Sequence, residues 1–508
     1  MRWPHRLAVV AAAYLAVAMN FIAGSSFESM IVPLSEDLGL SVSESSTLHS
    51  LPELAGFLIV FAAGSLALRF GRRMVIVVAA CVFSFGAIVM SLAPSAMGVA
   101  IARSLIGLGT VALAVAGLSL INVTFAGTAR RARAFAAVAA IPPVISLTLP
   151  NATAAVCTAL GWRFVPVIWL VAGGVLLVLT VISVPGRQSE STASELATPL
   201  LAGLVLSSIC LATVWLATPN SSMGIALAVA ALALVILVVL MRRLRRPGLD
   251  LRVLASRRGA LAGCAVALIW CVSLTFYVTI FIQFRYELPV TTAIAMLTLC
   301  QAAGIAGTFL FGFIASRIGA QRSALIAVCC AAALGLPLLV TSASSSVWLV
   351  IGCTVLLAIP NFGAIGPVTE HFLNGAPQDG SDAAAAMADG LSNVGFVAGG
   401  AVVSLLIFGT FSTALSSGLQ ERGYAADRAD AIAAEITGGT PSVELVERDG
   451  DTDPLLRPAL IDDMTTLDGA QVSALHAMGL AVTVSFGGAA LTLLPGIRRR
   501  RDLSTTSA

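Results

Sequence analysis

Four ionisable side chains of this sequence lie inside long apolar runs or near their ends: Glu28, Glu53, Arg103 and Asp389. A charged group at the centre of a bilayer-spanning helix costs about 2.5–3.5 kcal/mol on insertion scales, so a membrane protein retains few of them without a use. A carboxyl group at such a depth can bind and release a proton. A guanidinium can pair with a carboxylate or hold an anion. These residue types therefore suggest ion binding within a membrane.

Each of these side chains also has a plainer interpretation. Arg103 lies early in the run 97–125 and could serve a substrate or simply lock two helices together. Glu28 is near the outer end of the first run, and Glu53 is in the first turns of the second. Either carboxylate could bind protons, or could be solvated at the outer interface. The same alternatives hold for Asp389, in the first turns of a later run.

No catalytic motif accompanies these charges. The sequence has no GxSxG, Walker or HExxH motif and no paired Cys/His cluster. Its four His, at positions 5, 49, 371 and 476, are scattered, and we interpret each as a solvated side chain. The nine Cys fall within apolar runs, without disulfide or metal-binding spacing. We expect no enzyme activity, no metal and no cofactor.

The elements that position the charges are membrane-spanning helices. The chain has 508 residues, of which 58% are hydrophobic and 11% are charged, whereas soluble domains carry about 25% charged residues. Apolar runs of roughly 20 residues, each long enough to cross a bilayer, recur about fourteen times. Since the first run, 7–27, lacks a cleavage site, we interpret it as a retained helix. The sequence predicts an all-α integral membrane protein.

The distribution of Arg predicts the orientation of these helices. All 29 basic residues are Arg, which with the high Ala content indicates a GC-rich, bacterial genome. With the N-terminus inside, 22 Arg lie in inner segments and six in outer ones, and Arg103 lies within a run. Positive charge favours the cytoplasmic side. We therefore expect a multi-pass protein of the cell membrane with both termini in the cytoplasm.

Two segments interrupt the series of apolar runs. The inner segment 242–258 is rich in Arg and either lies against anionic lipid headgroups or only fixes the topology. The outer segment 412–472 contains twelve acidic residues and four Arg. A loop of that length is either functional or disordered, and we favour a partly ordered cap with a short helix near 424–435.

Glycine and arginine motifs recur at fixed places relative to the runs. A loop after the second run contains Gly64, Arg69, Gly71, Arg72 and Arg73, and the second half repeats it with Gly312, Arg317 and Gly319. The fourth run carries Arg103, Gly107 and Gly109. These motifs, with a Gly-Trp-Arg-Phe turn at 161–164 and the linker at 247–252, resemble the major facilitator superfamily. The similarity is greatest to its fourteen-span drug:proton antiporter branch.

The sequence departs from the branch at several motif positions. Leu68 stands where the signature loop has an acidic residue, and Ile106 replaces a Gln of the span 4 motif. The span 5 motif keeps Pro150 but has Leu, Thr and Ala where the branch has Gly. The branch's span 1 Asp falls on Gly24, and Glu28 lies one helical turn further on the same face.

The resemblance implies two pseudo-symmetric six-helix bundles with two inserted helices. The expected order is an N-terminal bundle 1–186, an inserted pair 187–241, the basic linker 242–258, spans 9–13 at 259–411, the acidic outer loop 412–472, span 14 at 473–497, and a basic tail 498–508.

The resemblance also implies a function. It predicts an efflux permease that exports a small amphipathic or drug-like molecule by alternating access and proton antiport, with Arg103 and Glu28 as the first choices for coupling. Its partners would be the small-molecule substrate, protons and the bilayer, with no nucleic acid, and the protein would act as a monomer. One alternative is a uniporter or an importer of a specific metabolite. Another is a membrane sensor or interaction protein that transports nothing.

Overall fold

The computed structural model describes most of the chain. The described residues are 3–40, 42–125, 134, 137–138, 140–186, 196–214, 221–244, 252–272, 290–342, 345–375, 381–437, 445–446, 460 and 465–494. All regular structure within them is helical. The predictions for the basic tail 498–508, for Arg130, Arg131 and Arg133, and for much of 242–258 and 438–464 lie outside them.

The helices of the first half follow the predicted runs. They are α1 (Trp3–Leu38), α2 (Val42–Phe70), α3 (Arg72–Ser91), α4 (Ala96–Thr124), α6 (Ile141–Leu160), the short η1 (Trp162–Phe164), α7 (Val165–Ser183), and then α8 (Ala197–Val214) and α9 (Ser221–Arg243).

The helices of the second half repeat this arrangement. They are α10 (Arg252–Ala255), α11 (Arg257–Trp270), α13 (Val290–Ile318), α14 (Ala320–Gly335), η2 (Leu336–Val340), α15 (Val347–Asn374), α16 (Ser381–Val394), η4 (Gly395–Gly399), α17 (Gly400–Glu421), α18 (Ala426–Thr437) and α20 (Thr465–Leu493).

Twelve helical segments of the described chain are long and apolar enough to cross a membrane. α8 and α11 are shorter, and they lie where the runs 197–217 and 259–283 predict spans. The all-helical, two-bundle architecture is confirmed, while the total of fourteen spans stays a prediction.

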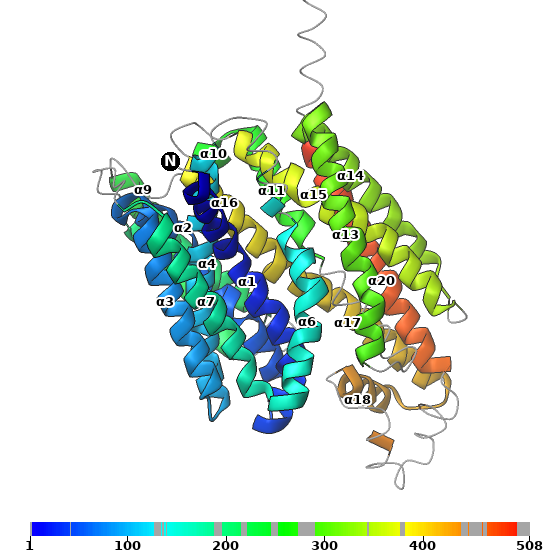
Figure 1. Cartoon of the computed structure of the whole chain (residues 1–508). Coiled ribbons are helices and arrows are strands. Elements are labelled where there is room, and N and C mark those ends of the chain that lie inside the picture. The colour runs from blue at the N-terminus through cyan, green and yellow to red at the C-terminus, as the bar shows by residue number, and fades with distance from the viewer. Residues whose placement is uncertain are drawn as a thin grey trace, which may run out of the picture.

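Equivalent helix pairs pack together in the two halves, which is the pseudo-symmetry that the repeated motifs predict. α4 packs against α1, α2 and α3, and α15 packs against α11, α13 and α14. The contacts of α7 with α1 and α3 correspond to those of α20 with α11 and α14. Figure 1 shows the two groups of helices side by side. Each half therefore forms a bundle around its own central helix.

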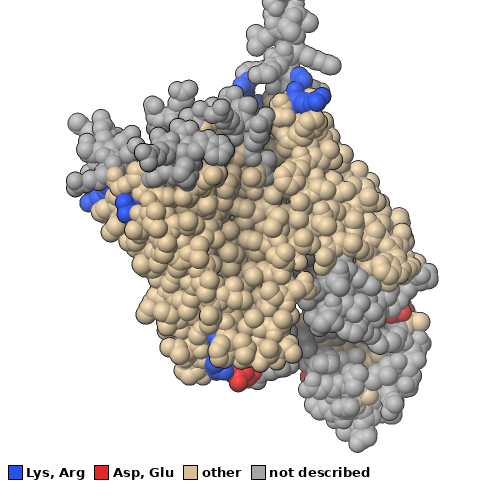
Figure 2. All heavy atoms as spheres, in the orientation of Figure 1, with Lys and Arg blue, Asp and Glu red and all other residues tan. Residues whose placement is uncertain are grey.

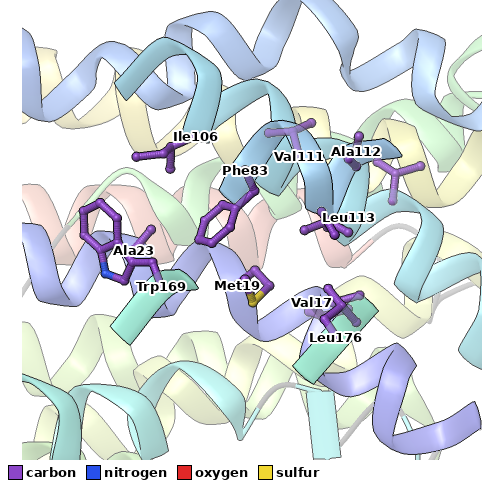
Figure 3. Packing of buried hydrophobic residues seen from close by; sticks show 14 of the residues in the cluster. Val17, Met19, Ala23, Phe83, Ile106, Val111, Ala112, Leu113, Trp169 and Leu176 are labelled. Atoms are coloured by element: carbon purple, nitrogen blue, oxygen red, sulfur yellow. The ribbon is translucent and has the colours of Figure 1, made fainter. Parts of the chain in front are cut away.

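Each bundle has a separate hydrophobic core. In the first, α1, α3, α4 and α7 meet around Phe83 and Trp169, both of which are fully buried (Figure 3). The second core is built from α11, α13, α14, α15, α16, α17 and α20. Phe61 and Leu118 pack against both cores, so they mark the place where the bundles touch.

The bundles meet through a pseudo-equivalent pair of contacts and one more. α16 of the second half packs against α2, α6 of the first half packs against α13, and α16 also packs against α4. The inserted pair is joined to the first bundle, because α8 packs against α2 and also touches η4 and α17. The inserted helices therefore cover the side of the molecule where α2 meets the second half.

Charged and apolar surfaces are segregated along the molecule. In Figure 2 the visible basic and acidic side chains lie toward the two ends, and a broad band without charge separates them. The N-terminus and α10 lie at one end, and α18 lies at the opposite end (Figure 1). This arrangement agrees with a chain that crosses the bilayer and places the acidic outer segment opposite the N-terminus.

The predicted helix 383–411 is interrupted and is longer than expected. A five-residue π-helical turn, η4, separates α16 from α17, and α17 continues to Glu421. Gly395 lies against Ala267 of α11, and Gly399 lies against Cys271, the residue after α11; a Cβ at either glycine would overlap its neighbour. A π turn shifts the register of a helix, so α16 and α17 present different faces to their neighbours.

The outer segment contains a small folded unit. α18 packs against α17, and its buried Ile432 joins Leu415 and Leu419 in a third hydrophobic cluster. The hydroxyl of Ser416 donates a hydrogen bond to Asp430 at 2.5 Å. The described part of this segment is therefore an ordered cap, with its helix close to the predicted 424–435.

Candidate functional site

The candidate site is built where α2 and α4 approach closely. Gly107 of α4 lies directly against the carbonyl of Pro52 in α2, at a distance that leaves no room for a Cβ. Gly56 of α2 is pressed in the same way against Val111. Small residues allow such contact between helices in lipid. Gly109 faces the opposite way and lies against Phe83 of α3, so the two motif glycines are explained by packing on both sides of α4.

Arg103 is buried one turn before Gly107, with 2% of the residue exposed. Its Nε donates a hydrogen bond to the carbonyl of Leu48 at 3.1 Å, and its Nη2 donates to the carbonyl of His49 at 2.9 Å. The guanidinium carbon lies 3.7 Å from the centre of the Phe27 ring, within the range of a cation–π interaction. The group therefore joins α4 to both α2 and α1.

Two carboxylates face this guanidinium from α1 and α2. Glu28, Glu53 and Arg103 lie within electrostatic range of one another, but the described residues show no direct ion pair between Arg103 and either carboxylate. Glu53 is half-buried, and its Oε2 is buried with no hydrogen-bond partner among the described residues. Glu28 is exposed although it belongs to the span Leu7–Ile31.

The spans of α1 and α2 place both carboxylates where the sequence predicts them. Although α2 begins at Val42, its apolar span is Thr47–Ala67, so Glu53 lies in the first two turns of that span. Glu28 lies about one turn before the end of the span Leu7–Ile31. The two carboxylates and Arg103 thus come together near the same end of the first bundle.

Asp389 does not join this group. It lies in α16 of the second half, half-buried, and Asn393 donates a hydrogen bond to its Oδ2 at 3.2 Å. The next residue, Gly390, lies against Phe61 of α2. Asp389 is therefore close to the contact between the bundles, with an amide partner of its own.

The two signature loops have the same geometry. Gly71 and Gly319, which precede α3 and α14, have φ values of 85° and 89°, in the region that favours glycine. Two residues later, Arg73 donates a hydrogen bond to the Val181 carbonyl at 2.9 Å, and Gln321 donates to the Leu493 carbonyl at 2.8 Å. Each loop thus ties its third helix to the last helix of the same bundle.

The remaining motif residues are placed as follows. Arg72 donates a hydrogen bond from Nε to the Ser119 hydroxyl at 2.5 Å. Arg69 and Arg317 lie over the rings of Phe70 and Phe313. Gly64 is buried in α2, Gly312 is half-buried in α13, and Pro150 is half-buried inside α6. These residues stand apart from the three clustered charges and belong to the framework of the bundles.

The far end of the first bundle is held by a polar clamp. Asp37, after the span of α1, accepts hydrogen bonds from Arg163 at 2.6 Å and from the indole of Trp162 at 3.2 Å. These hydrogen bonds, that from Arg163 above all, hold the pKa of Asp37 below its usual value. Arg163 also reaches the carbonyl of Ala93 at 3.4 Å. The clamp joins the last turn of α1 to η1 and to the loop between α3 and α4.

Sequence reasoning missed several members of the site. Phe27 and His49 stack with ring centres 6.2 Å apart, so the interpretation of His49 as a solvated side chain is wrong. Pro52 was the available signal, because a proline inside a helix leaves the carbonyl four residues earlier without its usual donor. That carbonyl belongs to Leu48, which Arg103 reaches.

Two apolar helix bundles with buried charges between helices define a membrane transporter fold rather than an enzyme. The family model described as Major Facilitator Superfamily matches residues 13–400. The chain therefore belongs to the major facilitator superfamily, and it is a multi-pass membrane transporter whose class binds small-molecule substrates within the membrane.

A curated relative is similar over most of the chain. The "Multidrug resistance protein Stp" of Mycobacterium tuberculosis (strain CDC 1551 / Oshkosh) is 26% identical over 371 residues, which cover 71% of this chain and 68% of the relative. The protein of the same name from strain ATCC 25618 / H37Rv matches to the same extent. The resemblance to a multidrug efflux relative is thus supported by sequence.

Solved structures share the fold at low identity. A bacterial homolog of the human lysosomal transporter Spinster, in an inward-facing and unoccupied conformation, has a TM-score of 0.58 at 15% identity and covers 97% of this chain and 99% of its own. The proton:xylose symporter XylE has a TM-score of 0.56 at 13% identity, with 95% and 96% covered. These similarities confirm the fold alone.

Proposed function

We propose that this protein exports small amphipathic or cationic molecules across the cell membrane in exchange for protons. The observation that carries the proposal is the group formed by Glu28, Glu53 and Arg103 inside the first bundle. Two carboxyl groups and one cation at this depth form a set whose protonation can be linked to substrate binding. The drug-resistance relative supports the direction and the class of substrate.

Within the proposal, Glu53 and Glu28 have different tasks. Glu53 has a buried oxygen with no hydrogen-bond partner among the described residues, and such an oxygen is costly when charged and satisfied when protonated or bound. Glu28 is exposed within an apolar span, so it can reach water or a cationic substrate. Competition between a proton and a cation for these carboxylates would couple the two fluxes.

The orientation and assembly follow from the charge pattern. Both termini lie in the cytoplasm, and the ordered cap of α18 lies on the outer side, because inner segments are rich in Arg. The two bundles rock about the contacts of α2 with α16 and of α6 with α13. Because both bundles belong to one chain, a single chain can complete the transport cycle, and in this proposal the protein acts as a monomer.

The test is ethidium flux in proteoliposomes that contain the purified protein. A gradient of two pH units with no membrane potential stores about 2.7 kcal/mol, so one-for-one antiport can concentrate ethidium up to about 100-fold. A uniporter brings the two sides only to equal concentration. We expect gradient-driven accumulation by the wild type, and its loss in Glu28→Gln and in Glu53→Gln.

Asp389→Asn is the matched control, since it also neutralises a carboxylate within a span but outside the cluster. We expect it to retain more accumulation than either glutamate variant. Ethidium movement that ignores the gradient would replace antiport by uniport, an alternative that the altered span 5 motif around Pro150 favours. Equal losses in all three variants would remove the special role of the cluster.

A further inference from the structure

We infer that Arg103 is a positioning residue, which completes the hydrogen bonding of α2 around Pro52 and thereby leaves the Glu53 carboxylate available for ion coupling. The inference deepens the proposed function and rests on it for the role of Glu53. In this role Arg103 donates hydrogen bonds to backbone carbonyls of α2 and does not pair directly with a carboxylate.

Pro52 lies inside the continuous helix α2. Proline has no backbone N–H, so the carbonyl of Leu48, four residues earlier, has no donor within its own helix. Leu48 is buried, with 4% of the whole residue exposed. A buried carbonyl without a partner is costly, particularly in a membrane where water is absent. The structure must therefore supply a donor from elsewhere.

Arg103 is that donor. Its Nε lies 3.1 Å from the Leu48 oxygen, and its Nη2 lies 2.9 Å from the His49 oxygen. The planar guanidinium can serve two successive carbonyls because its donors are held in a fixed fork. Gly107 permits this arrangement, since it allows α2 to lie directly against α4 one turn further on.

The consequence concerns Glu53, the residue after Pro52. The described hydrogen bonds of Arg103 go to the Leu48 and His49 carbonyls, and the face of its guanidinium lies over the ring of Phe27. It forms no direct ion pair with Glu53, whose Oε2 remains buried without a partner among the described residues. The proline thus diverts the nearest cation from the carboxylate to the backbone.

The inference separates two properties of Arg103, hydrogen-bond donation and charge. In Arg103→Gln the amide nitrogen is the same number of bonds from Cα as Nε, so it can still donate to the Leu48 carbonyl without a charge. In Arg103→Met the side chain is of similar length and apolar. The Gln and Met variants are therefore a matched pair that differ in donation and share the loss of charge.

The experiment measures thermal stability in detergent and gradient-driven ethidium accumulation in proteoliposomes for both variants. We expect Arg103→Gln to unfold at a higher temperature than Arg103→Met and to accumulate about threefold or more ethidium relative to it, because only Met leaves a buried carbonyl without a donor. Loss of the charge is recorded separately, as a displacement of the pH–flux profile that both variants share.

A second background tests the link to the proline. Pro52→Ala restores a backbone N–H at position 52 that can donate to the Leu48 carbonyl. The stability difference between the Gln and Met variants should therefore largely disappear when each is combined with Pro52→Ala. This background also keeps the comparison measurable if Arg103→Met alone fails to accumulate in the membrane.

Equal losses of thermal stability and of ethidium accumulation in Arg103→Gln and Arg103→Met, in the wild-type background, would overturn the inference, because charge would then be the property that matters. So would a Gln–Met stability difference that persists in the Pro52→Ala background. The comparison of unfolding temperatures among the Arg103 and Pro52 variants does not depend on proton coupling. Wild-type ethidium flux that ignores the gradient would therefore reject the proposed function, and the unfolding temperatures would still decide whether Arg103 supports the α2 backbone.

Discussion

Gly107→Ala tests whether the contact of α2 with α4 supports the site. The added methyl group would overlap the backbone carbonyl of Pro52, and neither partner has a flexible side chain that can move aside. The two helices must separate by at least about 1 Å to restore ordinary contact distances of roughly 3.5 Å. That movement carries the Leu48 carbonyl away from Arg103, whose hydrogen bond to it is 3.1 Å long.

The magnitude follows from a comparison with a glycine that has free space. Gly174 in α7 has no neighbouring atom within 4 Å of the place that an added methyl group would take, so Gly174→Ala should only gain the helix preference of alanine, about 0.5–1 kcal/mol. Gly107→Ala has the same gain but also an overpacking cost of about 1–3 kcal/mol. Because the helix preference cancels, the difference between the variants is the cost of the overlap.

The assay is thermal unfolding of both purified variants in one detergent, together with ethidium accumulation in proteoliposomes. We expect Gly107→Ala to unfold at a lower temperature than Gly174→Ala and to accumulate less ethidium, because the Leu48 carbonyl loses its donor. If the two variants unfold at the same temperature and transport equally, the close approach of α2 and α4 does not support the site and the reasoning fails.

Two further predictions concern the hydrogen bonds of Asp37 and the cap formed by α18. The pKa of Asp37 is lowered by its hydrogen bonds to Arg163 and Trp162, so the clamp stabilises the protein above the ordinary aspartate pKa and loses this effect as the pH falls through the lowered value. The difference in unfolding temperature between wild type and Asp37→Asn should therefore shrink on acidification, and a constant difference would contradict this. Ile432→Asp places a charge in the fully buried centre of the cap, which should cost several kcal/mol and expose the cap to protease. Asp427→Ala, at an exposed position of the same helix, should change neither the stability nor the protease resistance of the cap. Equal cleavage of both variants would show that the cap is not a folded unit.

The extent to which the sequence predicted the site differs from residue to residue. Arg103, Glu28 and Glu53 could be selected because a charge in an apolar run is costly wherever it lies. Their convergence could not be predicted, because the rotation of α1, α2 and α4 about their axes depends on packing between helices. Asp389 shows the limit of the rule, since it met the same criterion and lies in the other bundle.

Helix lengths were predicted less well than helix positions. Hydropathy gave residue 48 as the start of the second helix, whereas α2 begins at Val42. It also gave one helix for 383–411, where the structure has a π turn and an extension to Glu421. Hydropathy reports the part of a helix that lies in lipid, and it does not detect polar turns that continue a helix beyond the bilayer or a register shift within it.

The sequence by itself determined the class of the protein, because apolar runs of bilayer length, separated by Arg-rich inner segments, have few other solutions. The repeated glycine–arginine motifs determined the two-bundle arrangement, and the structure adds the φ values near 85–89° at Gly71 and Gly319 that explain their glycines. Only the tertiary structure decided what Arg103 does. Its partners are backbone carbonyls of another helix. Pro52 marks the Leu48 carbonyl as one that lacks its usual donor, but no residue type in the sequence shows which side chain of which helix will be brought within reach of it.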